Sequence, residues 1–235
     1  MNFCETAYRS VSGRVAAAGV AAGRDAVTLL AVSKTQPTGA IRALAALGQH
    51  GFGENHVQEA LAKQRELADL ALEWHLIGPL QSNKCREVAQ HFDWLQSLDR
   101  AKLIEPLARR RPAGSSALNV LIQVNIDDEA SKAGCAPGEI ATLAAQVAAS
   151  SRLRLRGLMA IPAPTPDLAR RRDAFRRMRA LFDDLRAVYA GVDTLSMGMS
   201  EDFELAIAEG ATMVRVGTAL FGARHRKSEI GNAEP

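Results

Sequence analysis

Lys34 is the residue of this sequence whose type and position best suit nucleophilic chemistry. It closes an apolar run that begins at Val27 and is followed by a turn containing Pro37. Such a run predicts a buried strand, in which Lys34 shares a face with Val32 and Leu30. An ammonium group on a core-facing side loses hydration, which lowers its pKa and favours the free amine. We therefore interpret Lys34 as an amine able to condense with an aldehyde, while a lysine at a strand end can also extend its amine into water.

A second set of residues could hold a phosphate group. Ser200 precedes Glu201 and Glu204, a spacing that predicts Ser200 as the N-cap of a helix starting at residue 201. Gly217 and Thr218 follow an apolar run, so a hydroxyl stands beside backbone N–H groups that a ligand can approach closely. Taken alone, without an amine such as that of Lys34 nearby, these residues are equally consistent with a helix capping box and an ordinary turn.

The elements that must position these residues follow from the hydrophobic pattern. Short apolar runs alternate with longer amphipathic stretches after a first helix at about 3–22. The strands are predicted at 27–34, 49–54, 73–78, 93–97, 118–126, 154–161, 194–199 and 212–217. The helices between them are predicted at 37–47, 56–70, 82–91, 100–110, 137–149, 167–189 and 201–209, with a short turn at 218–222.

Alternation of this kind indicates a parallel sheet with right-handed crossovers. Eight such units in about 200 residues favour a closed (β/α)8 TIM barrel of the α/β class, with a doubly wound open sheet as the alternative. We expect a single barrel domain over 1–223, which includes an extra N-terminal helix before the first strand. We expect the tail over 224–235 to be mobile. In a barrel of this kind, the active site lies at the carboxyl ends of the strands. Lys34 and the phosphate residues then share one opening, which indicates pyridoxal 5′-phosphate (PLP), a ligand with an aldehyde and a phosphate.

Several motifs, in order along the chain, resemble the pyridoxal phosphate homeostasis protein family. They are Ala31–Lys34, Phe52–Asn55 with Gln58 and Glu59, Trp74–Lys84, Gly157–Pro162, Leu195–Ser200, Met213–Thr218 and Phe221–Gly222. The resemblance implies a fold like the barrel domain of alanine racemase, with PLP held by Lys34 as an internal aldimine. It also implies that Asn55 lies beside the ring and Arg215 near the pyridine nitrogen. The phosphate would be held by Ser200, Gly217 and Thr218.

Arg215 has a chemical consequence in that arrangement. On the last strand it shares a face with Met213 and Gly217 and reaches the interior. A guanidinium donates hydrogen bonds and accepts none, so it would keep the pyridine nitrogen unprotonated and weaken the ring as an electron sink. Racemisation also needs a second acid or base, usually a tyrosine, but Tyr8 and Tyr189 fall in predicted helices. We also expect no counterpart of the second domain that covers the site in amino-acid racemases.

Two functions remain open on these grounds. In the first, the protein holds PLP, takes part in PLP homeostasis and delivers the cofactor to apo-enzymes, with no catalytic residue. In the second, it is a small PLP-dependent enzyme resembling an amino-acid racemase. The features around Arg215 favour the first function, and we expect the protein to act as a monomer.

Composition and charge argue against several classes of protein, namely disulfide-bonded, zinc-stabilised, membrane-spanning and nucleic-acid-binding proteins. The chain has 235 residues and a formal charge of +3. Its three cysteines are widely spaced, which argues against a disulfide framework and a structural zinc and predicts a reducing cytoplasm. No apolar stretch reaches the length of a membrane span. The arginine-rich segment 170–179 is interpreted as a solvated helix face and not as a nucleic-acid surface. The buried stripe of the same helix, predicted at 167–189, is expected to comprise Leu168, Phe175, Met178, Phe182, Leu185 and Tyr189.

Two further polar residues have open roles. His75 has no other metal-ligating side chain at suitable spacing, so we interpret it as a polar contact in the core. Glu54 precedes Asn55 and either orients a neighbouring group or acts as a weak base.

Overall fold

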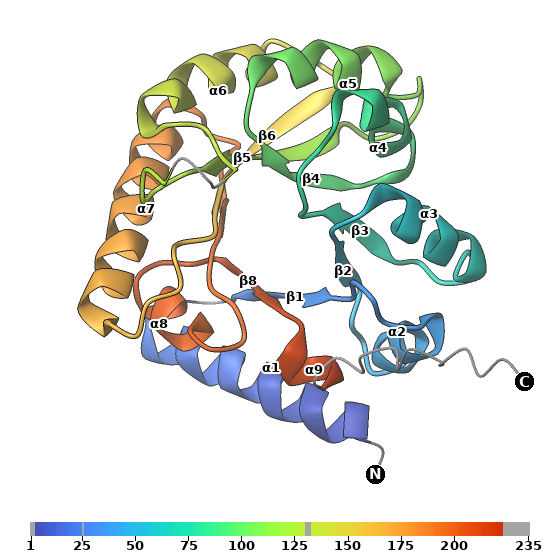
Figure 1. Cartoon of the computed structure of the whole chain (residues 1–235), viewed down its shortest axis with the longest axis vertical. Coiled ribbons are helices and arrows are strands. Elements are labelled where there is room, and N and C mark those ends of the chain that lie inside the picture. The colour runs from blue at the N-terminus through green and yellow to red at the C-terminus, as the bar shows by residue number, and fades with distance from the viewer. Residues whose placement is uncertain (1–2, 25, 130–132, 223–235) are drawn as a thin grey trace, which may run out of the picture.

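Eight parallel strands close into a barrel in this structure, a computed structural model that describes residues 3–24, 26–129 and 133–222. Each strand pairs with the next one along the chain, and β8 pairs with β1 through Thr28 opposite Met213 and Leu30 opposite Arg215. Helices surround the ring of strands (Figure 1). The predicted (β/α)8 barrel is therefore confirmed, and the open sheet is excluded. The predicted tail at 224–235 lies outside the described residues.

The bounds of the elements follow the predicted alternation closely. The strands β1 to β8 are Thr28–Val32, Gly51–Glu54, Glu73–Leu76, Trp94–Leu98, Leu118–Val124, Leu153–Ala160, Thr194–Ser196 and Met213–Val216. The helices α1 to α9 are Phe3–Ala21, Thr38–Ala45, Val57–Glu66, Cys85–His91, Ile104–Arg110, Ile140–Ala148, Leu168–Val188, Phe203–Ala208 and Thr218–Phe221. The 3₁₀ turns η1 to η3 are Ser82–Lys84, Ala101–Leu103 and Pro137–Glu139.

These 3₁₀ turns occupy the first positions of three predicted helices, those at 82–91, 100–110 and 137–149. The first N–H groups of a helix have no intrahelical partner, and a tighter 3₁₀ turn is a common way to begin. Each of the three turns leads directly into the α-helix that follows it, so the predicted element is present and only its first turn differs.

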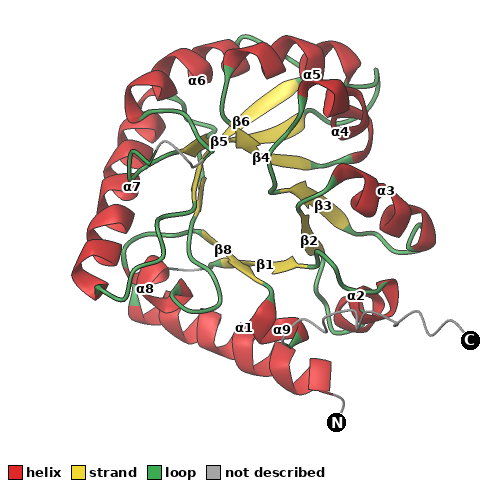
Figure 2. Cartoon of the chain, in the orientation of Figure 1, coloured by secondary structure: helices red, strands yellow, loops and turns green. Residues whose placement is uncertain are grey.

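Two apolar layers hold the barrel. The larger lies between the strands and the helices that surround them. Figure 2 shows the strands as an inner ring and the helices outside it. Within the ring there are smaller clusters, one of Leu30, Ile77 and Met213 and one of Trp94, Leu121 and Met159. The small interior clusters leave space near the carboxyl ends of the strands, where the polar residues of the site are found.

The N-terminal helix α1 lies outside the repeating pattern, as predicted. It packs against α8 and α9 (Figure 1), and its residues Val11 and Val15 are buried. Arg14 donates from Nε to Glu204 Oε1 over 2.7 Å, which ties α1 to α8. The helix thus covers the outer side of the two elements that follow β7 and β8.

Helix α7 carries the predicted arginine-rich face. Phe175, Met178, Phe182 and Leu185 are buried, as predicted. Leu168 is 67% exposed, so its place in the stripe was wrong; it is the first residue of the helix, where few neighbouring side chains surround it. Tyr189 follows the last residue of α7 and is half-buried.

The arginines of α7 are largely engaged with nearby carboxylates. Arg172 and Arg176 both pair with Glu209 over 3.0 Å, and Arg179 pairs with Asp183 over 2.6 Å. Glu209 follows the end of α8, so part of this face joins two neighbouring helices. None of the helices in the described part of the chain has the length and apolar character needed to span a membrane.

Candidate functional site

A cavity of about 610 Å³ opens where β1, β2, β7 and β8 end. Its lining includes all six residues that the sequence assigned to cofactor binding. They are Lys34, Asn55, Ser200, Arg215, Gly217 and Thr218. Residues that lie up to 184 positions apart in the chain therefore meet around one space because each follows or ends a strand of the same barrel. Their individual roles toward a cofactor remain predictions.

Lys34 lies in a turn and not in the strand. Strand β1 ends at Val32, and Lys34 and Thr35 form the turn that leads to α2. Lys34 is half-buried, and it lines the cavity together with Val32. The predicted common face of Val32 and Lys34 is thus confirmed, whereas the predicted strand position of Lys34 is wrong. The ladder to β2 ends at Val32 opposite Gly53, and past that point the backbone turns.

Three side chains from β2 and α3 hold Ser33 and Thr35, the residues on both sides of Lys34. Ser33 Oγ donates to Glu54 Oε1 over 2.6 Å, and Lys63 Nζ donates to the Ser33 carbonyl over 2.7 Å. On the other side, the Thr35 N–H donates to Glu59 Oε1 over 2.5 Å. The role predicted for Glu54, orientation of a neighbour, has this contact with Ser33 in its favour.

Asn55 enters the cavity because the end of β2 runs very close to the segment after β3. A Cβ atom added to Gly78 would lie 2.2 Å from the Asn55 carbonyl oxygen, so only glycine fits there. Ser97 Oγ on β4 donates to the Gly78 carbonyl over 2.6 Å and fixes this segment from the other side. The backbone of three adjacent strand ends thus sets the position of Asn55.

Arg215 is buried, with 3% of its surface exposed, and it faces the interior as predicted. It donates from Nη1 to Ser196 Oγ and from Nη2 to the Ala160 carbonyl, each over 2.8 Å. Both acceptors are neutral. Burial lowers the pKa of the guanidinium to about 10, and the negative charge of Asp202 opposes this shift. The group therefore stays cationic at neutral pH.

The hydrogen bonds of Arg215 continue across the barrel interior. Ser196 Oγ donates to Gln96 Oε1 over 2.7 Å, and Gln96 Nε2 lies 2.9 Å from His75 Nδ1. Because an amide nitrogen is a donor, His75 Nδ1 accepts, and its Nε2–H is left to donate to Glu73 Oε1 over 2.8 Å. A chain of donors thus runs in one direction from the buried arginine to a carboxylate at the start of β3.

His75 itself does not line the cavity. It is buried against Trp94, with the two rings stacked 5.1 Å apart, and burial lowers its pKa while the hydrogen bond to Glu73 opposes the shift. The interpretation of His75 as a polar core contact is confirmed. Within the described residues, no group of three or more His, Cys, Asp or Glu side chains has a metal-binding arrangement.

Ser200 lies on the cavity but does not cap a helix. Helix α8 begins at Phe203 with Asp202 at the N-cap position, so the predicted start at residue 201 was wrong. The backbone of Gly198 has a φ of 91°, and the Met199 N–H donates to Asp202 Oδ1 over 2.7 Å. This turn delays the helix and leaves Ser200 at the cavity, where its hydroxyl is not required for capping.

Several cavity residues were missed by the sequence analysis. Arg171 was assigned to the solvated face of its helix, but 14% of its side chain is exposed, and it lies within 3.8 Å of Asp202. It also donates to the Thr165 carbonyl. Gln123 at the end of β5 and the exposed Met199 complete another part of the wall. Alternation along the strand could have indicated Gln123, but the direction of Arg171 depends on how α7 docks.

Neither tyrosine lines the cavity. Tyr8 lies in α1, and Tyr189 follows the carboxyl end of α7. Both positions agree with the prediction that the tyrosines are far from the strand ends that form the site. The cavity walls contain the carboxylates Glu201 and Asp202 and the basic side chains Lys34, Arg171 and Arg215.

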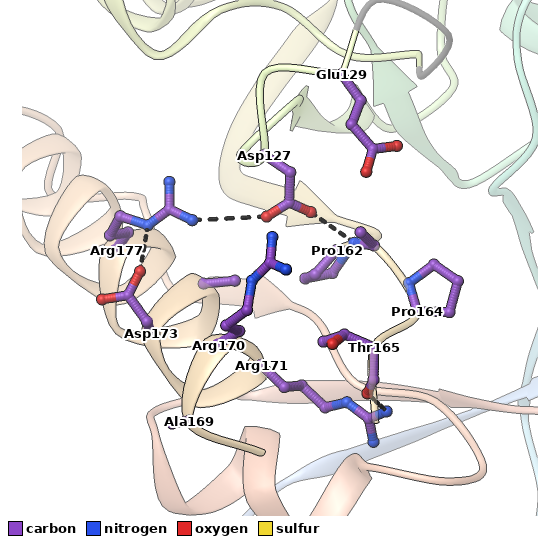
Figure 3. A pocket seen from close by; sticks show the side chains of 12 residues that line it. Asp127, Glu129, Pro162, Pro164, Thr165, Ala169, Arg170, Arg171, Asp173 and Arg177 are labelled. Carbon is purple, nitrogen blue, oxygen red and sulfur yellow. Dashed lines mark hydrogen bonds and ion pairs between the residues drawn. The ribbon is translucent and has the colours of Figure 1, made fainter. Parts of the chain in front are cut away.

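A second cavity, of about 620 Å³, shares Pro162, Ala163, Pro164 and Arg171 with the first. Figure 3 shows that Arg177 of this cavity is engaged with two of its carboxylates. Arg177 contacts Asp173 over 2.9 Å and Asp127 over 3.5 Å, and the Ala163 N–H donates to Asp127 Oδ2. Since Arg177 is neutralised by these carboxylates, and since all six predicted binding residues line the first cavity, we take the first cavity as the candidate site.

Comparison with known proteins gives a consistent result. The alanine racemase N-terminal domain family matches residues 14–225. The pyridoxal phosphate homeostasis protein of Pseudomonas aeruginosa is 57% identical over 216 residues, which are 91% of this chain and 93% of that protein. The protein of the same name from Escherichia coli is 52% identical over 219 residues, covering 91% and 94%.

Among solved structures, PipY of Synechococcus elongatus with PLP bound superposes with a TM-score of 0.82 at 39% identity. The match covers 94% of this chain and 100% of that one. The chain belongs to the alanine racemase N-terminal domain family and, within it, to the pyridoxal phosphate homeostasis proteins.

Proposed function

We propose that this protein binds PLP in the cavity at the strand ends, with Lys34 as the residue bonded to it, and takes part in PLP homeostasis. The observation that carries the proposal is the meeting of one amine, one buried cation and a set of hydroxyl and backbone donors around a single cavity. The names of the relatives and the PLP in the PipY structure support the same function.

The residues present fit PLP in size and charge. A cavity of about 610 Å³ is within the usual range for small-ligand sites. Ser200 and Thr218 offer hydroxyl groups, and Gly217 lets the chain pack closely, because a Cβ there would lie 3.2 Å from the Val32 carbonyl oxygen. When bound, PLP supplies an aldehyde that condenses with a primary amine and releases water. Lys34 provides that amine, and Arg171 adds positive charge to the cavity wall, which favours an anionic ligand.

Arg215 is the reason to propose a binding protein and not a strong catalyst. Its position is set by Ser196 and Ala160, and as a donor it cannot stabilise a protonated pyridine nitrogen. Neither tyrosine lines the cavity to return a proton from the opposite face. We further propose that the protein acts as a monomer and passes PLP to apo-enzymes by transient contact.

The first test is covalent trapping of PLP with borohydride. Lys34→Ala should lose all trapped cofactor while its Tm stays within about 2 °C of wild type, since removal of a half-buried amine opens no core cavity. Lys102→Ala, which changes an exposed lysine on η2, is the matched control and should trap PLP as wild type does. Wild-type trapping in Lys34→Ala would show that another lysine carries the cofactor.

The second candidate function is a small PLP-dependent enzyme resembling a racemase, which the family membership favours. It predicts racemisation of alanine or another amino acid by the purified protein. A turnover above about 1 s⁻¹, the low end for ordinary enzymes, would replace the binding function with this one.

A further inference from the structure

Lys63 is a buried lysine on α3 for which neither the fold nor the proposed cofactor contacts supply a role. Its exposed fraction is 6%, and its ammonium group donates to three oxygens, each over 2.7 Å. These are the Ser33 carbonyl, Glu54 Oε1 and Glu59 Oε1. We call Glu59 and Lys63 of α3, together with Glu54 at the end of β2, the α3 charge cluster.

The α3 charge cluster contacts the chain directly before and directly after Lys34. Ser33 is held twice, through its carbonyl by Lys63 and through its hydroxyl by Glu54. Thr35 is held through its N–H by Glu59. The cluster thus fixes the two peptide units from which the Lys34 side chain projects.

The backbone at this turn has an unusual conformation. Thr35 has a φ of 65°, in the left-handed region that β-branched residues rarely enter. Such a conformation persists when surrounding contacts impose it, and these are common at functional sites. The hydrogen bond from the Thr35 N–H to Glu59 is a contact of this kind.

In the α3 charge cluster, the combined effect of burial and hydrogen bonding is unfavourable for the ionised form of Glu54 but not for that of Glu59. Burial raises the pKa of Glu54, although hydrogen bonds from Lys63 and Ser33 oppose this shift, and Glu54 Oε2 has no hydrogen-bond partner among the described residues. Burial also acts to raise the pKa of Glu59, but hydrogen bonds from Lys63 and Thr35 outweigh it and the pKa is lowered. Buried ion pairs are often no more stabilising than apolar side chains of the same size. A role in fixing geometry accounts for these residues better than a role in stability.

We propose that Glu54, Glu59 and Lys63 are positioning residues that hold the Lys34 amine in the direction required to bond with an aldehyde in the cavity. This inference rests on the proposed function, because it takes Lys34 as the bonded residue. The cluster acts through the backbone of Ser33 and Thr35 and through the Ser33 hydroxyl, and it does not line the cavity itself.

The test compares two ligands, PLP and 4-deoxypyridoxine 5′-phosphate, which has the ring and the phosphate but no aldehyde. In Glu59→Ala the Thr35 N–H and Lys63 each lose an acceptor, and the partly exposed side chain is removed without a core cavity. We expect PLP affinity and the rate of covalent bonding to fall about tenfold, the effect of one hydrogen bond to a charged group. The affinity for the deoxy analogue should not change.

Two control variants separate positioning from a general effect on structure. Glu66→Ala changes a glutamate on the same helix that accepts from Thr38 Oγ1 over 2.8 Å, one element beyond the Lys34 turn, and it should bind both ligands as wild type does. Glu59→Gln keeps an acceptor oxygen at the same place and should restore most of the PLP affinity lost in Glu59→Ala. Lys63→Met should reproduce the loss, with Tm measured to identify any unfolding.

The outcomes distinguish this inference from the proposed function. If wild type forms no trapped adduct with PLP, the proposed function fails. If wild type is trapped but Glu59→Ala and folded Lys63→Met bond PLP at the wild-type rate, the positioning role is wrong while the proposed function stands. An equal loss of affinity for PLP and for the deoxy analogue would likewise overturn positioning, because it would mean a general change in the cavity.

Discussion

At the scale of single residues, the cavity is lined by side chains proposed to contact PLP at its phosphate and at its ring. Ser200 and Thr218 lie at the cavity edge, and neither hydroxyl is a helix cap: α8 is capped at Asp202, and α9 at Gly217. Arg215 is positioned by two neutral acceptors and remains cationic. These differences allow separate predictions for the phosphate end and for the ring end of the cavity.

For the phosphate end, Ser200→Ala and Thr218→Ala should each weaken PLP affinity by about tenfold. A hydrogen bond to a charged group contributes about 1.5–3 kcal/mol, and backbone N–H groups would still hold the phosphate in each variant. Titration of the apo-protein with PLP, followed by absorbance, gives the dissociation constants. Unchanged values in both variants would mean that the phosphate is held elsewhere.

For the ring end, Arg215→Glu should strengthen the electron sink, because a carboxylate can accept a proton shared with the pyridine nitrogen. The measurement is exchange of the α-proton of alanine for deuterium, which should be faster in the variant than in wild type. The buried carboxylate would lose the contacts with Ser196 and Ala160 and should lower stability by about 3–5 kcal/mol. Arg215→Gln, which is neutral, is the control: it should lose the cation without the gain in exchange.

At the scale of elements, the close packing of β6 against its neighbours depends on one glycine. Gly157 has a φ of 146°, and a Cβ there would lie 1.9 Å from the Thr194 carbonyl oxygen on β7. The pairing of β5 with β6 also shifts register between Val120 and Leu121, where Gly157 pairs. The strand therefore bends at this position before it reaches Ala160, whose carbonyl accepts from Arg215.

Gly157→Ala should accordingly destabilise the protein by more than about 3 kcal/mol, among the larger effects of single substitutions. The matched substitution is Gly13→Ala within α1, where an added Cβ would have no atom within 4 Å. It should stabilise the protein by about 0.5–1 kcal/mol, because alanine favours a helix over glycine. Chemical denaturation of both variants measures the two changes, and equal stabilities would contradict the close approach of β6 to β7.

At the scale of the whole molecule, a polar chain crosses the barrel. It links Arg215 on β8 with Ser196 on β7, Gln96 on β4 and His75 and Glu73 on β3. Two pairs of consecutive strands, joined by Ser196 and Gln96 that are 100 positions apart, therefore share one set of hydrogen bonds. Loss of one link leaves a buried polar group without a partner. The folded barrel requires His75 to remain neutral, since its Nδ1 must accept.

This requirement predicts how stability depends on pH. The folded pKa of His75 is lowered from 6.5 by burial, so below about 6.5 the unfolded chain binds a proton that the folded chain does not. The stability is complete above that pH and is lost as the pH falls toward the folded pKa, with a slope approaching about 1.4 kcal/mol per pH unit. The carboxyl of Glu73, whose pKa is lowered by its hydrogen bond with His75, adds a further loss only below about pH 4.5.

Chemical denaturation at pH 7 and pH 5 measures this loss. The difference between the two pH values should shrink in His75→Gln, which cannot gain a proton, provided that the variant still folds at pH 7. It should persist in His91→Gln, which changes an exposed histidine at the end of α4. The same pH dependence in all three proteins would show that other groups produce it.

Much of this molecule follows from its sequence alone. Short apolar runs alternating with amphipathic stretches determined eight strands, the barrel and its N-terminal helix, because hydrophobic patterning is a local property. Since parallel strands end on one side, the same pattern also brought Lys34, Asn55 and Arg215 to a common opening.

The tertiary structure decided which neighbours these residues meet. Alternation shows the face on which a side chain lies but not which strand lies across the barrel, so the hydrogen bonds from Arg215 to His75 could not be predicted. In the same way, the docking of α7 turned Arg171 into the cavity, and that of α3 brought Lys63 under the Lys34 turn. Such contacts depend on how rigid elements pack at long range, and no local pattern specifies that packing.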